Sequence, residues 1–165
     1  DMRTVLLSLL ALSLLAACSG PKNGVATDDG RFGGPAPADS LFFSLERTPC
    51  FGMCPSYRIH VYRSGQATWE GVGHVEKMGL HRGRIGRDTL EALLNEAERI
   101  GYFGLEDKYD GPVTDLPSTL YRMVSGERDK AITARYKVPR ELKDFGRYAD
   151  SLLVPVPWRP VGAAR

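Results

Sequence analysis

Cys50 and Cys54 are the residues of this chain whose type and spacing point most directly to chemistry. They lie in the segment RTPCFGMCPSY, residues 47–57, where one proline precedes the C-x₃-C pair and another follows it. Such a pair forms either a disulfide that closes a short loop or a redox-active dithiol. Thioredoxin-like redox sites use C-x₂-C at the start of a helix, which lowers the pKa of the thiol. Here the spacing is longer and a strand is expected to follow. The pattern therefore favours a structural disulfide, with a thiol-redox enzyme that uses Cys50 and Cys54 as the alternative.

The aspartates and histidines supply the other titratable candidates, and none forms a recognised pattern. Asp107, Asp110 and Asp115 lie in EDKYDGPVTD. A calcium loop needs oxygen ligands at alternating positions and a closing glutamate, which this segment lacks. We expect Asp115 to order the loop, either by accepting backbone N–H bonds or by pairing with an arginine. The three histidines match no compact zinc pattern with the cysteines. We therefore predict no metal site and no cofactor.

Composition narrows the function classes only slightly. The chain has 165 residues, of which 42% are hydrophobic and 25% are charged, with a net charge of +2. This is typical of one globular domain, and a charge so close to neutral gives no reason to expect a nucleic-acid partner. No G-x-S-x-G, P-loop or H-E-x-x-H motif indicates a catalytic residue.

The amino-terminal residues read as a targeting signal. Residues 5–17, VLLSLLALSLLAA, carry no charge and are too short to span a bilayer, which takes about 20 residues. The run ends in LAAC, which resembles a bacterial lipobox. We expect residues 1–17 to be a lipoprotein signal peptide and Cys18 to be acylated after cleavage. Ser19 stands where an aspartate signals retention in the inner membrane, which favours the periplasmic face of the outer membrane.

Residues 18–39 are expected to be an acylated cysteine followed by a flexible linker. They are dominated by Gly, Pro, Ala and Asp, which bury too little apolar surface to offset the entropy of ordering. The acylation of Cys18 also accounts for the odd number of cysteines. It leaves Cys50 and Cys54 as an even pair in an oxidising compartment.

The remaining residues show the periodicities of an α+β domain. Apolar and polar residues alternate in the strand segments, and apolar residues recur at helical spacing in two others. We expect strands over residues 41–46, 57–62, 67–72 and 74–85, a helix over 88–100, strands over 119–124 and 130–136, and a helix over 139–153. Short connections favour antiparallel pairing, so the order ββββαββα predicts a mostly antiparallel sheet with two helices on one face. The domain would span residues 40–153, followed by a Pro-rich tail, residues 154–165, whose Trp158 docks on it.

Two motifs carry a resemblance to a known family. RTPCFGMCPSY and VTDLPST, residues 113–119, together with the element order, resemble the bacterial domain of unknown function 6438 over residues 41–153. The resemblance implies a small α+β domain, often found on exported lipoproteins, and carries over no catalytic residue. Arg47 is the first residue of the cysteine segment and Tyr57 is the last. With Asp115 they are the candidate ligand-binding or loop-ordering residues.

These observations favour a non-enzymatic envelope protein that binds or scaffolds a partner. The alternative is a thiol-redox or other envelope enzyme that uses Cys50 and Cys54. The protein would contact the membrane through its amino-terminal lipid. An envelope protein or an anionic polymer is the possible further partner. Residues 77–87 contain four basic residues and His81 without an acidic one. They could meet lipid phosphate or an anionic polymer, or they could be a solvated edge strand whose charge blocks aggregation. We favour the second interpretation.

Overall fold

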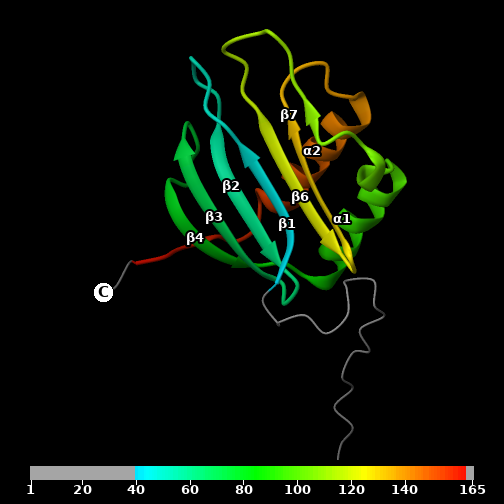
Figure 1. Ribbon diagram of the computed structural model, residues 1–165. Coiled ribbons are helices and arrows are strands. Elements are labelled where there is room, and N and C mark those ends of the chain that lie inside the picture. The colour runs from blue at the N-terminus through cyan, green and yellow to red at the C-terminus, as the bar shows by residue number, and fades with distance from the viewer. Residues whose placement is uncertain (1–39, 163–165) are drawn as a thin grey trace, which may run out of the picture.

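The computed structural model describes residues 40–162, which form one sheet of eight strands with two α-helices on one of its faces (Figure 1). The strands are β1 (Leu41–Arg47), β2 (Ser56–Tyr62), β3 (Gln66–Gly73), β4 (Gly79–Arg84), β5 (Lys108–Tyr109), β6 (Thr119–Ser125), β7 (Arg128–Ala134) and β8 (Arg159–Pro160). The helices are α1 (Arg87–Arg99) and α2 (Arg140–Leu153), with a short 3-10 helix at Tyr102–Gly104. The predicted α+β class is confirmed. The predicted signal peptide, the acylation of Cys18 and the linker lie outside the described residues.

The strand order is β5-β7-β6-β1-β2-β3-β4-β8, and every pair is antiparallel except β5 with β7. β1 lies in the interior of the sheet, between β2 and β6. Arg47, the last residue of β1, is therefore directly opposite Tyr57 on one side and Thr119 on the other. Neither helix in residues 40–162 has the length and apolar character needed to cross a membrane.

The core lies between the sheet and the two helices, and alternate strand residues and one stripe of each helix fill it. Phe145 of α2 is fully buried and packs edge-on against Phe43, with ring centroids 5.8 Å apart. α1 buries Leu90, Leu93, Leu94 and Ala97, the stripe that its sequence spacing predicts. Gly86 precedes α1 without a side-chain cap, and Pro139 precedes α2 in the same way.

Two predicted strands have bounds that differ by more than one residue from those in the structure. β4 begins at Gly79 rather than at residue 74, because the chain bends before Gly79, whose φ is +78°. The register of β3 with β4 is continuous through Gly83. Gly83 lets Trp158 approach, and a Cβ there would lie 2.9 Å from that ring. β7 begins at Arg128 and ends at Ala134, earlier than predicted.

The segment after α2 returns to the sheet. Trp158 is buried, as expected, and its Nε1–H donates to the carbonyl of Leu153 at 3.0 Å. The next two residues form β8 beside β4. The sequence missed β5 and β8 because a strand of two residues carries no periodicity.

Candidate functional site

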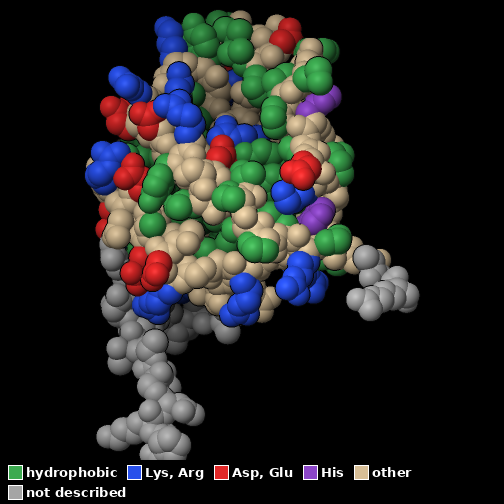
Figure 2. All heavy atoms as spheres, turned by 180° about the vertical axis from the view of Figure 1, so that it is seen from behind, with side chains coloured by type: hydrophobic (Ala, Val, Ile, Leu, Met, Phe, Trp, Pro, Cys, Tyr) green, Lys and Arg blue, Asp and Glu red, His purple; other side chains and the backbone are tan. Residues whose placement is uncertain are grey.

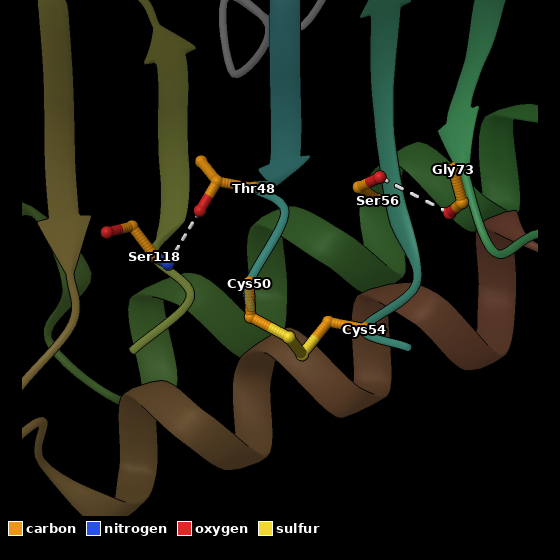
Figure 3. Close-up of a disulfide and its surroundings, with 6 residues drawn as sticks. All are labelled: Thr48, Cys50, Cys54, Ser56, Gly73 and Ser118. Carbon is orange, nitrogen blue, oxygen red and sulfur yellow. Dashed lines mark hydrogen bonds between the residues drawn. A yellow bond between two sulfur atoms is a disulfide. The ribbon is translucent and has the colours of Figure 1, made fainter. Parts of the chain in front are cut away.

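The disulfide loop, residues 48–55, connects β1 to β2 and is fixed at both ends. Cys50 and Cys54 form a disulfide, with their Cα atoms 5.7 Å apart. The N–H of Thr48 donates to the carbonyl of Ser118 at 3.0 Å. The N–H of Ser118 donates to Thr48 Oγ1 at 2.7 Å, as Figure 3 shows. These contacts join the disulfide loop to the loop that precedes β6. At the other end, the hydroxyl of Ser56 donates to the carbonyl of Gly73 at 3.2 Å.

The two joined loops expose apolar side chains. Phe51 is 92% exposed, Met53 is 83% exposed and Leu116 is 41% exposed. A cavity of about 420 Å³ lies between the loops, and Asp115 and Arg135 are among the residues that line it. We call residues 48–55 and 113–118 the tip. The tip lies at the upper end of the molecule in Figure 1, and hydrophobic side chains gather at that end in Figure 2.

A polar cluster ties the base of the tip to α2. Arg47 donates from Nε and from one terminal nitrogen to Asp150 Oδ2, at 3.0 and 2.5 Å. Its other terminal nitrogen donates to Thr119 Oγ1 at 3.1 Å. Tyr57 donates its hydroxyl proton to Asp150 Oδ1 at 2.6 Å, and its oxygen accepts from Arg47 Nε at 3.1 Å. The cluster therefore joins β1, β2 and β6 to α2 immediately below the disulfide loop.

The pKa shifts in this cluster are those of groups that hold structural hydrogen bonds. Burial raises the pKa of Tyr57, and its hydrogen bond to Asp150 raises it further, so the phenol stays protonated at neutral pH. Burial opposes the charge on Arg47, but the contact with Asp150 outweighs it and the pKa of Arg47 is raised. Both oxygens of Asp150 accept bonds from within the cluster. The cluster residues therefore form these hydrogen bonds with one another.

Tyr57 also lines a second cavity, of about 380 Å³, together with Trp69, Lys77 and Asp150. The Tyr57 ring stacks on Trp69, with centroids 4.6 Å apart and an interplanar angle of 14°. The indole N–H of Trp69 donates to the carbonyl of Lys77 at 2.8 Å. The stacking on Trp69 therefore holds the ring of Tyr57, while Arg47 and Asp150 hold its hydroxyl.

The structure brings two of the three candidate ligand-binding or loop-ordering residues together. Arg47 and Tyr57 meet in the cluster, whereas Asp115 lies on the exposed tip with φ +71° and accepts from the hydroxyl of Thr114 at 3.3 Å. Arg135 bonds to the carbonyl of Val113 and pairs with Asp110 rather than with Asp115.

Sequence reasoning missed Asp150 and Thr119. The one local signal for Asp150 is its position next to the buried stripe of α2, where a carboxylate needs a partner. Within residues 40–162 no group of three or more His, Cys, Asp or Glu side chains is placed to hold a metal ion.

The comparison with known families agrees with the motifs. The family model of the domain of unknown function DUF6438 matches residues 41–153. No curated protein and no solved structure matches the chain. The matched range contains the whole disulfide segment and all four members of the polar cluster, and it ends before Trp158 and β8. The chain belongs to the DUF6438 family.

Proposed function

We propose that this chain is a lipid-anchored protein of the cell envelope whose domain is a non-catalytic module that binds a partner protein through the tip. The exposure of Phe51 and Met53 on a loop closed by the disulfide carries this proposal. Large apolar side chains held in the open on a fixed loop are typical anchors of protein interfaces. Because the loop is already ordered, little conformational entropy is lost when a partner binds it.

The two edges of the sheet favour recognition by side chains rather than by strand addition. The edge strands β5 and β8 have only two residues each, and β8 contains a proline. Such short edges offer few free backbone groups to an incoming strand. The tip instead offers an aromatic anchor beside the exposed carboxylate of Asp115. The partner surface that fits is an apolar pocket with a basic residue at its rim.

The position of the tip relative to the predicted linker favours a protein over the membrane of the anchor. The linker joins the domain at Leu41, the first residue of β1, and the disulfide loop follows the last residue, Arg47. At roughly 3.3 Å per residue, the six steps from Leu41 to Arg47 separate these ends by about 20 Å. Phe51 and Met53 therefore lie beyond the end of β1 opposite to the one that the linker would join.

Two observations support a non-catalytic role. The polar groups of Arg47, Tyr57 and Asp150 bond to one another, as in a cluster that holds the fold together. The residues after Cys54 enter β2, so no helix amino terminus is present there to lower the pKa of a Cys54 thiol.

Site-specific photo-crosslinking in intact cells tests the binding proposal. A benzophenone amino acid is placed at position 51, and the control carries it at Glu127, an exposed turn residue at the opposite end of the sheet. We expect one discrete adduct with another protein from position 51 and none from position 127. Excess purified protein should compete the adduct away, whereas protein with Phe51→Ser and Met53→Ser should not. Equal adducts from both positions, crosslinks only to lipid or to a second copy, or equal competition by both proteins would contradict the proposal.

The lipid anchor has its own test. The mature protein, purified from envelopes, should begin at Cys18 and be heavier than its sequence by the mass of the acyl chains. An intact mass that matches an unmodified chain, or an amino terminus elsewhere, would refute the anchor and leave the tip proposal standing.

A further inference from the structure

We infer that a second surface, formed by β3, β4 and β8, binds a phosphate group. A cleft of about 530 Å³ is lined by Gln66, Arg82, Gly83, Arg84, Pro157 and Arg159. Three of these six residues are arginines, and they come from two strands that the chain brings together only through the docked segment after α2. We call this the arginine cleft.

The sheet register places the arginines on one face. Arg82 is directly opposite Arg159, and Arg84 is directly opposite Gln66. Directly opposite side chains of antiparallel strands share a face, and residues two apart in a strand do as well. The three guanidinium groups and the Gln66 amide therefore project from the same side of the sheet. It is the face opposite to that of the buried His81 and of Gly83, against which Trp158 packs.

The charges of the arginine cleft are uncompensated within the described chain. Most arginines in residues 40–162 have a carboxylate partner, as Arg58 does with Glu46 and Arg122 with Asp129. Arg82, Arg84 and Arg159 have no ion pair with any residue in that range. Like charges directly opposite one another in a sheet are destabilising, so the pair Arg82 and Arg159 costs stability unless an anion lies between them.

The lining residues indicate which anion fits. A guanidinium group donates two parallel hydrogen bonds to a phosphate, and three such groups can satisfy three or four oxygens, more than a carboxylate offers. The side chain of Gln66 adds a neutral donor. No aromatic ring lines the cleft, so a nucleobase or a sugar would find nothing to stack on. The chemistry is therefore recognition of the phosphate group itself.

The phosphate could belong to a lipid headgroup or to a free ion. The position of the cleft favours the headgroup. Gln66 and Arg84 lie at the same end of the sheet as Leu41, where the linker to the proposed lipid anchor joins the domain. This preference rests on the lipid anchor proposed above, whereas the recognition of phosphate by the cleft does not.

Two binding measurements test the inference on the chain expressed from position 18 with Cys18→Ser, because acyl chains would bind any vesicle. One follows the rise in Tm with inorganic phosphate, with chloride at equal ionic strength as the control. The other follows sedimentation with vesicles of phosphatidylglycerol and phosphatidylcholine, against vesicles of phosphatidylcholine alone. We expect Arg82→Gln and Arg159→Gln each to weaken binding by about tenfold, the loss of one charged hydrogen-bonding group. Arg140→Gln, an equal change of charge at a site 89% exposed, should leave it unchanged.

Binding in either arm that depends on Arg82 and Arg159 supports the site, and the arm that responds identifies the source. Binding in neither arm, or equal loss with Arg140→Gln, overturns it.

A second variant tests the charge arrangement without a ligand. Arg159→Glu should raise the Tm in the absence of phosphate, because it replaces a repulsive neighbour of Arg82 with an attractive one, and it should abolish phosphate binding. A lower Tm for Arg159→Glu with a native circular-dichroism spectrum would contradict the repulsion between Arg82 and Arg159.

Discussion

Arg47 and Asp150 lie 103 residues apart in the sequence, and their side chains form an ion pair with an N–O distance of 2.5 Å. Each side chain is about one quarter exposed, so the pair is shielded from water more than the surface ion pairs of the domain. It joins the end of β1, where the disulfide loop begins, to the last turns of α2. The pair therefore fixes the sheet, the helix and the base of the tip relative to one another.

Removal of the Asp150 carboxylate should destabilise the domain strongly. Asp150→Ala leaves Arg47 part-buried without its acceptor and leaves the Tyr57 hydroxyl without its own. We expect the free energy of unfolding in urea to fall by about 2–3 kcal/mol. Asp144→Ala on the same helix is the matched control, since its pairs with Arg140 and Arg147 are exposed and should contribute less than about 1 kcal/mol. Equal losses for the two variants would show that the cluster is no more than a surface ion pair.

Alkaline pH should unfold the domain through its buried tyrosines. Burial raises the pKa of Tyr57 and Tyr102, and raises the pKa of Tyr121 to about 12. The folded state therefore keeps protons that the unfolded chain loses above pH 10, the ordinary tyrosine value. The stability is fully present below that pH and is lost as the pH rises through the folded values. The loss should approach about 1.4 kcal/mol per pH unit for each tyrosine that is ionised only in the unfolded chain.

Urea titrations from neutral pH to about pH 12, with tyrosinate absorbance as a second probe, measure this dependence. Tyr57→Phe should lower the stability at neutral pH and flatten its decline above pH 10. An unchanged slope in Tyr57→Phe would mean that the Tyr57 phenol is not held protonated by its surroundings.

Gly146→Ala should destabilise α2, although alanine is the better helix former. A Cβ at Gly146 would lie 2.3 Å from the hydroxyl oxygen of Tyr121. Tyr121 is buried and must shift to admit the methyl group, which should cost about 1–3 kcal/mol. In contrast, a side chain at Gly86, at the start of α1, meets open space. Gly86→Ser supplies a capping hydroxyl there, so it should stabilise the domain by about a few tenths of a kcal/mol. Thermal unfolding should give a lower Tm for Gly146→Ala and a higher Tm for Gly86→Ser. A higher Tm for Gly146→Ala would contradict the close packing of Gly146 and Tyr121.

The disulfide should contribute to stability as well as to the shape of the tip. Cys50→Ser with Cys54→Ser opens a loop of sequence separation 4 and should lower stability by about 2 kcal/mol in the chain-entropy description. The double variant should also lose the adduct formed through position 51. Intact-mass measurement of envelope protein after alkylation without reductant checks the bond itself. Two alkylated thiols in native protein would refute the structural disulfide and favour the thiol-redox alternative.

The segment beyond the family match should be part of the folded unit. Trp158 is buried against Trp69 and Gly83, with the ring centroids of the two tryptophans 6.0 Å apart. Trp158→Ala should lower the free energy of unfolding by about 3–5 kcal/mol, the usual effect of removing a large buried aromatic side chain. A chain that ends at Leu153 should be destabilised at least as much. Unchanged urea midpoints for both would show that the docked segment is dispensable.

The sequence alone determined the features that depend on local order. The alternation around Tyr57 and Ile59, and the stripe from Leu90 to Ala97, give strands and helices because they repeat the period of each element. The spacing of Cys50 and Cys54 and the strand expected after them favoured a disulfide, since a loop with three intervening residues is local in the sequence.

The tertiary structure alone decided which distant residues meet. Arg47 and Tyr57 were candidates from their motif, but Asp150 and Thr119 joined them only because β1 pairs on both sides and α2 crosses the end of the sheet. The same holds for Arg159, which no local pattern relates to Arg82. Pairing partners are set by the burial of one common core, a property of the whole chain, so no segment records them on its own.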